Sequence, residues 1–248
     1  MESSSSPQGP NSPADLPCKI WALADLHLSF GVPNKEMSKF GWINHVEEIE
    51  KNWRLLIKNE DLVLIPGDIS WAKTPKEALP DLEFLHSLPG TKLLLKGNHD
   101  YWWPSNQKLS QLLPPSLHFI CNTTFNFRHV TIGGTRFWDS PEYTLNYETK
   151  TDLKIYAREV ERLKLSLASL NPVASHRIVM THYPPIGMEM QDSEASLLFE
   201  KYKIDHIVFG HLHNMDPSLN LYGEKGGTKY HLVACDYLKF SPLLIMEL

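Results

Sequence analysis

The sequence predicts an α/β fold, and two observations support this prediction. Short, continuously apolar segments recur along the chain, a pattern typical of strands buried on both faces of a sheet. Longer segments with helical spacing of apolar residues separate them, which indicates crossover helices. With 248 residues, 42% of them hydrophobic and 21% charged, the chain is able to bury a sizeable core.

The expected elements follow one another in a regular alternation. The segments that qualify as strands are 19–24, 62–66, 92–96, 178–181, 207–209, 230–234 and 243–246. The segments that qualify as helices are 45–58, 75–86, 104–113, 152–170 and 193–202. The helix at 75 has a clear start, because Thr74 is a suitable N-cap and Pro75 fits the first helical position.

Two stretches depart from this alternation. Residues 1–17 are rich in Ser, Pro and Asn, and we predict a disordered tail there, followed by a single domain over 18–248. Between about 116 and 151, Asn, Thr and aromatic residues dominate, and Gly133-Gly134 is a turn signal. We interpret this second stretch as extra strands and loops within the same domain.

Composition narrows the cellular setting and the partners. Three cysteines, Cys18, Cys121 and Cys235, lie far apart, which disfavours a disulfide framework and fits a reducing cytoplasm. No apolar run approaches the ~20 residues that span a bilayer, so we expect a cytoplasmic protein that does not enter the membrane. The formal net charge is −5 without a basic block, so nucleic acid gains no support as a partner. The sequence gives no indication of the oligomeric state.

Polar clusters directly follow several of the strand candidates. They are Asp25-Leu26-His27, Gly67-Asp68, Gly97-Asn98-His99-Asp100, His182 and Gly210-His211-Leu212-His213. Because ligands collect beyond the carboxyl ends of strands in an open α/β sheet, we expect these side chains to gather at one edge. Burying so many polar groups together is costly unless a counter-charge compensates. Divalent Mn, Fe or Zn would compensate, because imidazole and carboxylate ligands suit these ions.

The order Asp-x-His, Gly-Asp, Gly-Asn-His-Asp, His and Gly-His-x-His is similar to the signature of the calcineurin-like metallophosphoesterase superfamily, and it spans Asp25 to His213. The whole chain also resembles small bacterial predicted phosphohydrolases of that superfamily. The resemblance implies a sandwich of two mixed β-sheets flanked by helices. It also implies two divalent metal ions as cofactors and a small phosphate ester as substrate.

The resemblance implies a role for each position of the signature. Asp25, His27 and His213 would bind the first metal; Asn98, His182 and His211 would bind the second; Asp68 would bridge both. His99 and Asp100 would be catalytic: His99 would face the substrate and Asp100 would support it. The Asn98 amide would also contact the substrate. Hydrolysis would then proceed by direct attack of a metal-bridging hydroxide.

Two further features leave alternatives open. Arg136 could grip a phosphate through its fork-shaped guanidinium, or it could form a structural ion pair. Tyr101, Trp102 and Trp103 directly follow the Gly97–Asp100 cluster. They could stack on a base or sugar of the substrate, and packing under the loop is at least as well supported.

The sequence after Gly67-Asp68 differs from that of one branch of the superfamily, and this difference favours a phosphodiester over a phosphomonoester as the substrate. Phosphoprotein phosphatases carry an Asp-Arg pair shortly after their Gly-Asp, where this chain has Ile69-Ser70-Trp71-Ala72-Lys73. The alternatives are a broad-specificity phosphomonoesterase and a nucleotide–lipid pyrophosphatase, whose relatives usually carry Arg at the position of His99. An inactive metal-binding scaffold for protein partners is a further alternative, although such members have lost ligands that are all present here.

Overall fold

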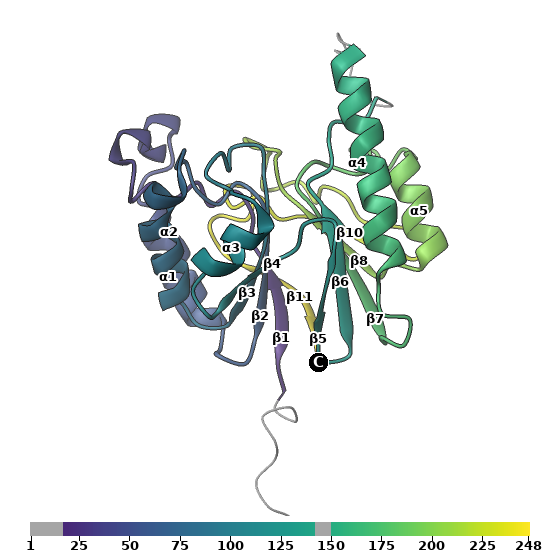
Figure 1. The fold of residues 1–248 in the computed structure, drawn as a ribbon, viewed down its shortest axis with the longest axis horizontal. Helices are drawn as coiled ribbons and strands as arrows, with labels where there is room; N and C mark the ends of the chain where they lie inside the picture. The colour runs from purple at the N-terminus through teal and green to yellow at the C-terminus, as the bar shows by residue number, and fades with distance from the viewer. Residues whose placement is uncertain (1–16, 142–149) are drawn as a thin grey trace, which may run out of the picture.

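The computed structural model describes residues 17–141 and 150–248, and it consists of two β-sheets packed face to face with helices on their outer faces (Figure 1). This arrangement confirms the sandwich of two mixed sheets. The disordered tail expected over 1–17 falls, apart from Pro17, outside the described residues. No helix within the described ranges is both long enough and apolar enough to cross a membrane.

The first sheet has the strand order β11-β1-β2-β3-β4, and only β11 runs antiparallel to its neighbour. Its strands are β1 (Lys19–Ala22), β2 (Leu62–Pro66), β3 (Thr91–Leu95), β4 (Leu117–Phe119) and β11 (Leu243–Glu247). Its outer face is covered by α1 (His45–Leu56), α2 (Pro75–Ser87) and α3 (Asn106–Leu112) (Figure 1). Two 3-10 helices, η2 (Pro33–Lys35) and η3 (Met37–Phe40), lie in the connection between β1 and α1.

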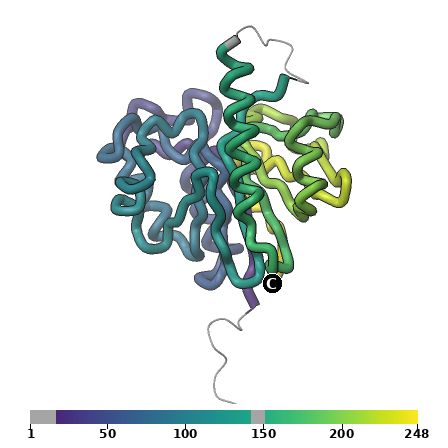
Figure 2. Tube along the Cα trace, turned by 45° about the vertical axis from the view of Figure 1, so that its right-hand side comes forward, coloured from purple at the N-terminus to yellow at the C-terminus, as the bar shows by residue number. Residues whose placement is uncertain are grey.

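The second sheet has the order β5-β6-β7-β8-β10-β9, with antiparallel pairs at both edges and parallel strands between them. Its strands are β5 (Thr124–Phe127), β6 (Val130–Thr135), β7 (His176–Thr181), β8 (His206–Phe209), β9 (Glu224–Lys225) and β10 (Thr228–Leu232). Helices α4 (Lys150–Ala168) and α5 (Glu194–Tyr202) cover it. Apart from β11, which returns to the first sheet, the two halves of the chain thus lie on opposite sides of the sandwich, as the colours of Figure 2 show.

Apolar side chains from both sheets fill the space between the layers. Ile20, Leu64 and Leu93 of the first sheet and Ile132 and Val208 of the second all have no exposed surface there. Continuous burial of this kind is why β2 reads as an unbroken apolar run, Leu62–Pro66. Separate apolar clusters lie beneath the outer helices of each half.

Hydrogen bonds join the two sheets at their carboxyl edge. The backbone nitrogen of Ala24, just beyond β1, donates to Val233 O at 2.7 Å, and the nitrogen of Cys235 donates to Ala24 O at 3.0 Å. Residues 24 and 234 therefore form a parallel bridge between segments that continue β1 and β10. This bridge explains why the strand expected over 19–24 leaves its own sheet at Ala22.

The remaining predicted elements appear with ends shifted by a few residues. The start of α2 is confirmed, since Thr74 and Glu77 form a reciprocal capping box with Pro75 in the first turn. The turn expected at Gly133-Gly134 is wrong, because both residues lie inside the fully buried strand β6. Glycine is needed there for close approach: a Cβ at Gly134 would clash with Met180 O on β7. Residues 142–149 of the stretch 116–151 lie outside the described residues.

Candidate metal centre

The loops that follow β1, β2, β3, β7 and β8 meet at the joined edge of the two sheets. They bring together every residue that was expected to bind metal: Asp25, His27, Asp68, Asn98, His182, His211 and His213. The side chains fall into two groups that share one carboxylate.

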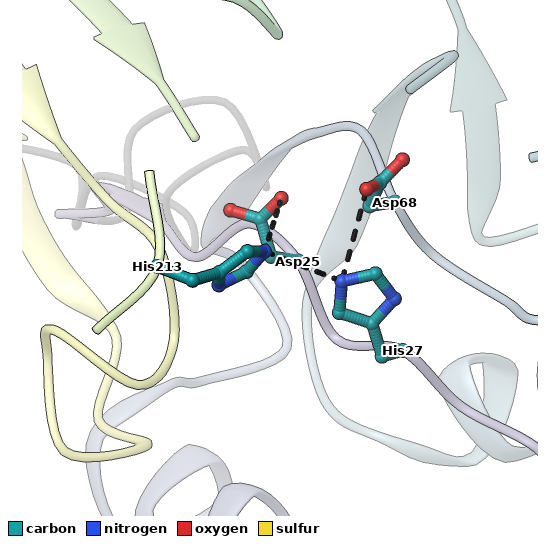
Figure 3. A group of neighbouring side chains, drawn as sticks. All are labelled: Asp25, His27, Asp68 and His213. Carbon is teal, nitrogen blue, oxygen red and sulfur yellow. Dashed lines mark hydrogen bonds and ion pairs between the residues drawn. The ribbon is translucent and has the colours of Figure 1, made fainter. Parts of the chain in front are cut away.

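The first group consists of Asp25, His27, Asp68 and His213, each offering one ligand atom, with all four atoms within 4.8 Å of one another (Figure 3). The two imidazoles face each other, with 3.4 Å between the Nε2 atoms of His27 and His213. His27 Nε2 lies 3.7 Å from Asp68 Oδ2, and His213 Nε2 lies 3.9 Å from Asp25 Oδ1. Ligand atoms at this spacing can surround a single cation.

The second group is centred on the amide oxygen of Asn98. Its Oδ1 lies 2.6 Å from His182 Nε2 and 3.0 Å from His211 Nδ1. Asp68 connects the two groups, because its Oδ1 lies 3.5 Å from His182 Nε2 while its Oδ2 faces His27. One carboxylate therefore presents an oxygen to each group, which is the geometry needed to hold two like charges close together.

The electrostatics of the first group fit a bound cation. Burial raises the pKa of Asp25 well above its usual value, and the negative charge of Asp68 adds to the effect. Burial lowers the pKa of His27 well below 6.5, so this ring is neutral and free to ligate. Its Nδ1 is buried without a hydrogen-bond partner among the described residues. Two buried carboxylates beside the neutral imidazole of His27 are donors that a divalent metal stabilises.

The second group has the same character. Burial lowers the pKa of both His182 and His211 to about 3, so both rings stay neutral at ordinary pH. Burial also raises the pKa of Asp68. The residues present therefore fit two divalent ions with nitrogen and oxygen ligands.

The backbone around these ligands is strained. Four of them adopt positive φ angles, in a region that residues other than glycine seldom occupy: Asp25 (58°), His27 (45°), Asp68 (51°) and His211 (73°). Such conformations cost of order 1–3 kcal/mol each and persist at functional sites because the surroundings impose them. Here they occur just beyond the strand ends, in the loops that carry both ligand groups.

The glycines of the signature give the ligands room. A Cβ at Gly97 would clash with Asp68 Oδ1, and a Cβ at Gly210 would clash with Asp25 Oδ2. The Gly-Asn-His-Asp and Gly-His-x-His segments therefore pass directly against the carboxylates of the neighbouring loops. Only glycine allows this close approach.

Asp236 orients His213 and was missed by the sequence analysis. It accepts a hydrogen bond from His213 Nδ1 at 3.1 Å and from the backbone nitrogen of Asn214 at 2.8 Å. Burial disfavours the charged ring of His213, but the bond to Asp236 and the nearby carboxylates outweigh it and raise its pKa. The signal was available, because Asp236 lies two residues beyond the strand expected over 230–234.

Asp100 takes a different position from the one expected. Its carboxylate accepts hydrogen bonds from the backbone nitrogens of Gly97, Ile69 and Ser70, at 2.8, 2.9 and 3.1 Å. The indole of Trp102 donates the remaining bond, at 2.9 Å. Within the described residues, no hydrogen bond joins Asp100 to the ring of His99. Asp100 is thus a positioning residue that ties the loop after β2 to the loop after β3.

His99 lies at the mouth of the site. Its ring centroid is 4.6 Å from that of Trp71 and 5.6 Å from that of His27, and its backbone nitrogen donates to Asp68 Oδ1 at 2.8 Å. Trp102 and Trp103 are buried, as the packing alternative predicts, whereas Tyr101 is 65% exposed.

Arg136 follows β6 beside the second ligand group. Its backbone oxygen accepts from the nitrogen of His182 at 3.0 Å, and its positive charge contributes to the low pKa of His182. The guanidinium lies over the ring of Trp138, 4.9 Å from the centroid. No ion pair of Arg136 occurs in the part of the chain that the structure describes.

Comparisons with solved structures and with protein-family models agree with this fold. A comparison with curated protein sequences gave no match. The phosphopantetheinyl hydrolase of Mycobacterium tuberculosis has a similar structure, with a TM-score of 0.58 and 15% identity, over 90% of this chain and 91% of that one. GAP50, the anchor in the inner membrane complex of Plasmodium, is also similar, with a TM-score of 0.52 and 15% identity, over 89% and 72% of the two chains. The family model described as calcineurin-like phosphoesterase matches residues 18–215, most of the chain and the whole ligand set, and the chain belongs to that family.

Proposed function

We propose that the chain is a dinuclear-metal-dependent phosphoesterase that hydrolyses a small phosphate ester, with phosphodiesters favoured over monoesters. The observation that carries this proposal is the pair of ligand groups joined by the carboxylate of Asp68. Asp25, His27 and His213 would hold one ion and Asn98, His182 and His211 the other. Two bound ions would supply Lewis-acid activation of the phosphoryl group and of an attacking water.

The chain's own residues supply orientation and proton transfer. The His99 ring, at the mouth of the site, is placed to hydrogen-bond a phosphoryl oxygen or to protonate the departing alkoxide. Arg136 adds positive charge beside the second ligand group and can pair with an anionic phosphate. Asp100 holds the loops that carry Asp68 and His99 in register.

The loop after Asp68 supports the preference for a diester. Ile69 and Ser70 are buried with their nitrogens bonded to Asp100, and Trp71 stacks on the ring of His27 with 4.7 Å between centroids. A neutral aromatic ring therefore stands in the stretch where the phosphoprotein phosphatases carry an arginine. A phosphomonoester dianion needs more cationic compensation than a diester monoanion, so this wall favours the diester.

The test uses metal-stripped protein reloaded with Mn²⁺ and assayed in parallel on an aryl phosphodiester and an aryl phosphomonoester. We expect faster turnover of the diester, abolished by Asp68→Asn. His99→Ala should lower the rate by about 10²–10⁴-fold with metal still bound, the usual contribution of a general acid or base. Full rate in that variant would remove His99 from the chemistry.

Two other outcomes change the assignment. Equal or faster turnover of the monoester would indicate a general phosphomonoesterase. Absence of turnover of either ester by protein that holds two metal ions per chain would indicate a metal-binding scaffold instead.

A further inference from the structure

A small cavity opens directly beside the first ligand group. Its volume is about 240 Å³. The polar side of its wall is made by His27, His99, His213 and Asn214, and its apolar side by Met37, Phe40, Trp42 and Trp71. Among the described residues that line it there is no carboxylate, lysine or arginine. We call this cavity the aromatic pocket.

Most of the apolar wall is fixed in place by contacts with the metal centre. Trp71 stacks on His27 at an interplanar angle of 22°, and its indole nitrogen donates to Met37 Sδ at 3.2 Å. The ring of Trp42 lies 5.5 Å from that of His213. The pocket is therefore largely preformed, because the side chains that shape it also pack against the expected ligands.

Phe40 completes the wall from the connection between β1 and α1, which carries η2 and η3 and projects from the first sheet at the upper left of Figure 1. Its side chain is 67% exposed. Exposure alone does not mark a site, since Ile43 in the same connection is 72% exposed and lines no part of the pocket. Phe40 differs because it lines the same cavity as His99 and His213.

We propose that the aromatic pocket binds the organic group of the substrate ester, and that this group is a single aromatic ring or an apolar group of similar size. The inference rests on the proposed function: a phosphoryl group beside His27, His99 and His213 directs one of its ester substituents into the adjoining cavity. Four apolar side chains and no charged one line the far wall, so an apolar substituent gains most by entering.

The size of the pocket limits the substituent. Cavities that take drug-sized ligands measure ~300–1,000 Å³, and this one is smaller at about 240 Å³. One aromatic ring fits within this volume, whereas only part of a lipid chain or of a dinucleotide could be buried there. The pocket therefore favours small ester alcohols.

The test measures binding without turnover. Methyl(phenyl)phosphinate and dimethylphosphinate are monoanions without an ester bond, and they differ only by a phenyl for a methyl group. Both are titrated into Mn²⁺-loaded protein by calorimetry, with tryptophan fluorescence as a second readout. Burial of the phenyl ring should make the first bind about 10- to 100-fold more tightly than the second.

A matched pair of variants locates the phenyl group. Phe40→Ala should reduce the phenyl preference at least about threefold, the loss expected for removing one wall of the pocket, and leave the affinity for dimethylphosphinate unchanged. Ile43→Ala, equally exposed and outside the pocket, should leave both affinities unchanged.

The outcomes separate this inference from the proposed function. Equal affinities for the two phosphinates would refute the proposed role of the aromatic pocket, and diester turnover would still support the phosphoesterase function. A phenyl preference reduced in Phe40→Ala, without turnover of any ester, would uphold the pocket and refute the hydrolytic function. A preference that Phe40→Ala leaves at its wild-type size, or that Ile43→Ala reduces equally, would overturn the assignment to this pocket. So would a metal-loaded protein that binds neither probe.

Discussion

Replacing Asp236 with Asn should weaken metal binding by the first ligand group without unfolding the chain. In the native protein both carboxylate oxygens of Asp236 accept hydrogen bonds, from His213 Nδ1 and from the Asn214 nitrogen. The Asn side chain has one acceptor only. If its oxygen keeps the bond to Asn214, its NH₂ group faces Nδ1, and His213 must move its proton to Nε2. That nitrogen is the one that faces His27 and Asp25.

The structure sets the expected magnitude. Removing the hydrogen-bond partner of a metal-binding histidine costs about 10–100-fold in metal affinity, or about 1.4–2.8 kcal/mol. The side chain of Asp236 is only 11% exposed, so solvent screens its interaction with His213 weakly. We therefore expect the upper half of this range.

Calorimetric titration of metal-free protein with Mn²⁺ at pH 7 measures the effect. One of two binding steps should weaken in Asp236→Asn, while the thermal melting of the metal-free protein stays close to wild type. Asp216→Asn is the matched control, because Asp216 is exposed in the β8–β9 connection that also carries His213, and its side chain hydrogen-bonds only to Ser218 among the described residues. Two binding steps of wild-type affinity in Asp236→Asn would refute this role.

Three further perturbations have defined outcomes. Gly97→Ala should abolish metal binding in the same titration, because the new methyl group would clash with the backbone nitrogen and carboxylate of Asp68. Gly223→Ala is the control: it has open space around it, so its free energy of unfolding should change by less than about 0.5 kcal/mol. Burial raises the pKa of Asp81 from 3.8 to about 6, so the folded state binds the proton more tightly than the unfolded state and stability falls as pH rises through this window. Asp81→Asn should reduce this pH-dependent loss of unfolding free energy by up to about 3 kcal/mol, measured by denaturant melts at several pH values. A pH dependence equal to that of the wild type would contradict this role of Asp81. Mn²⁺ at a hundred times its Kd should stabilise the folded protein by about 2.7 kcal/mol per site, which corresponds to a rise of about 5–10 °C in the Tm measured by calorimetric scanning. An unaltered Tm would contradict specific binding to the folded state.

The sequence was sufficient to predict the α/β elements and the gathering of the polar side chains at one edge, because both follow from local patterns. Apolar runs such as Leu62–Pro66 mark strands, and parallel strands all end at one edge, so the polar residues that follow them must meet. The same rule also applies to Asp236, which lies two residues beyond the strand expected over 230–234 and was overlooked because it is not part of the signature.

Features that depend on contacts across the fold could not be predicted. Gly133-Gly134 has the local pattern of a turn but lies in a buried strand. The two positions are glycine because α4 and β7 pass too close to leave room for a side chain. Asp100 is adjacent to His99 in sequence, but its carboxylate turns toward the backbone of the neighbouring loop. Spacing along the chain carries no information on such directions.

Each ligand group draws on both halves of the chain, and this division has a consequence for biosynthesis. Asp25 and His27 depend on His213, and Asn98 depends on His182 and His211, so the N-terminal half alone holds only part of either set. A nascent chain whose second sheet has not yet docked would therefore lack part of each ligand set. If the site binds metal as we propose, metal loading would follow the docking of the second sheet.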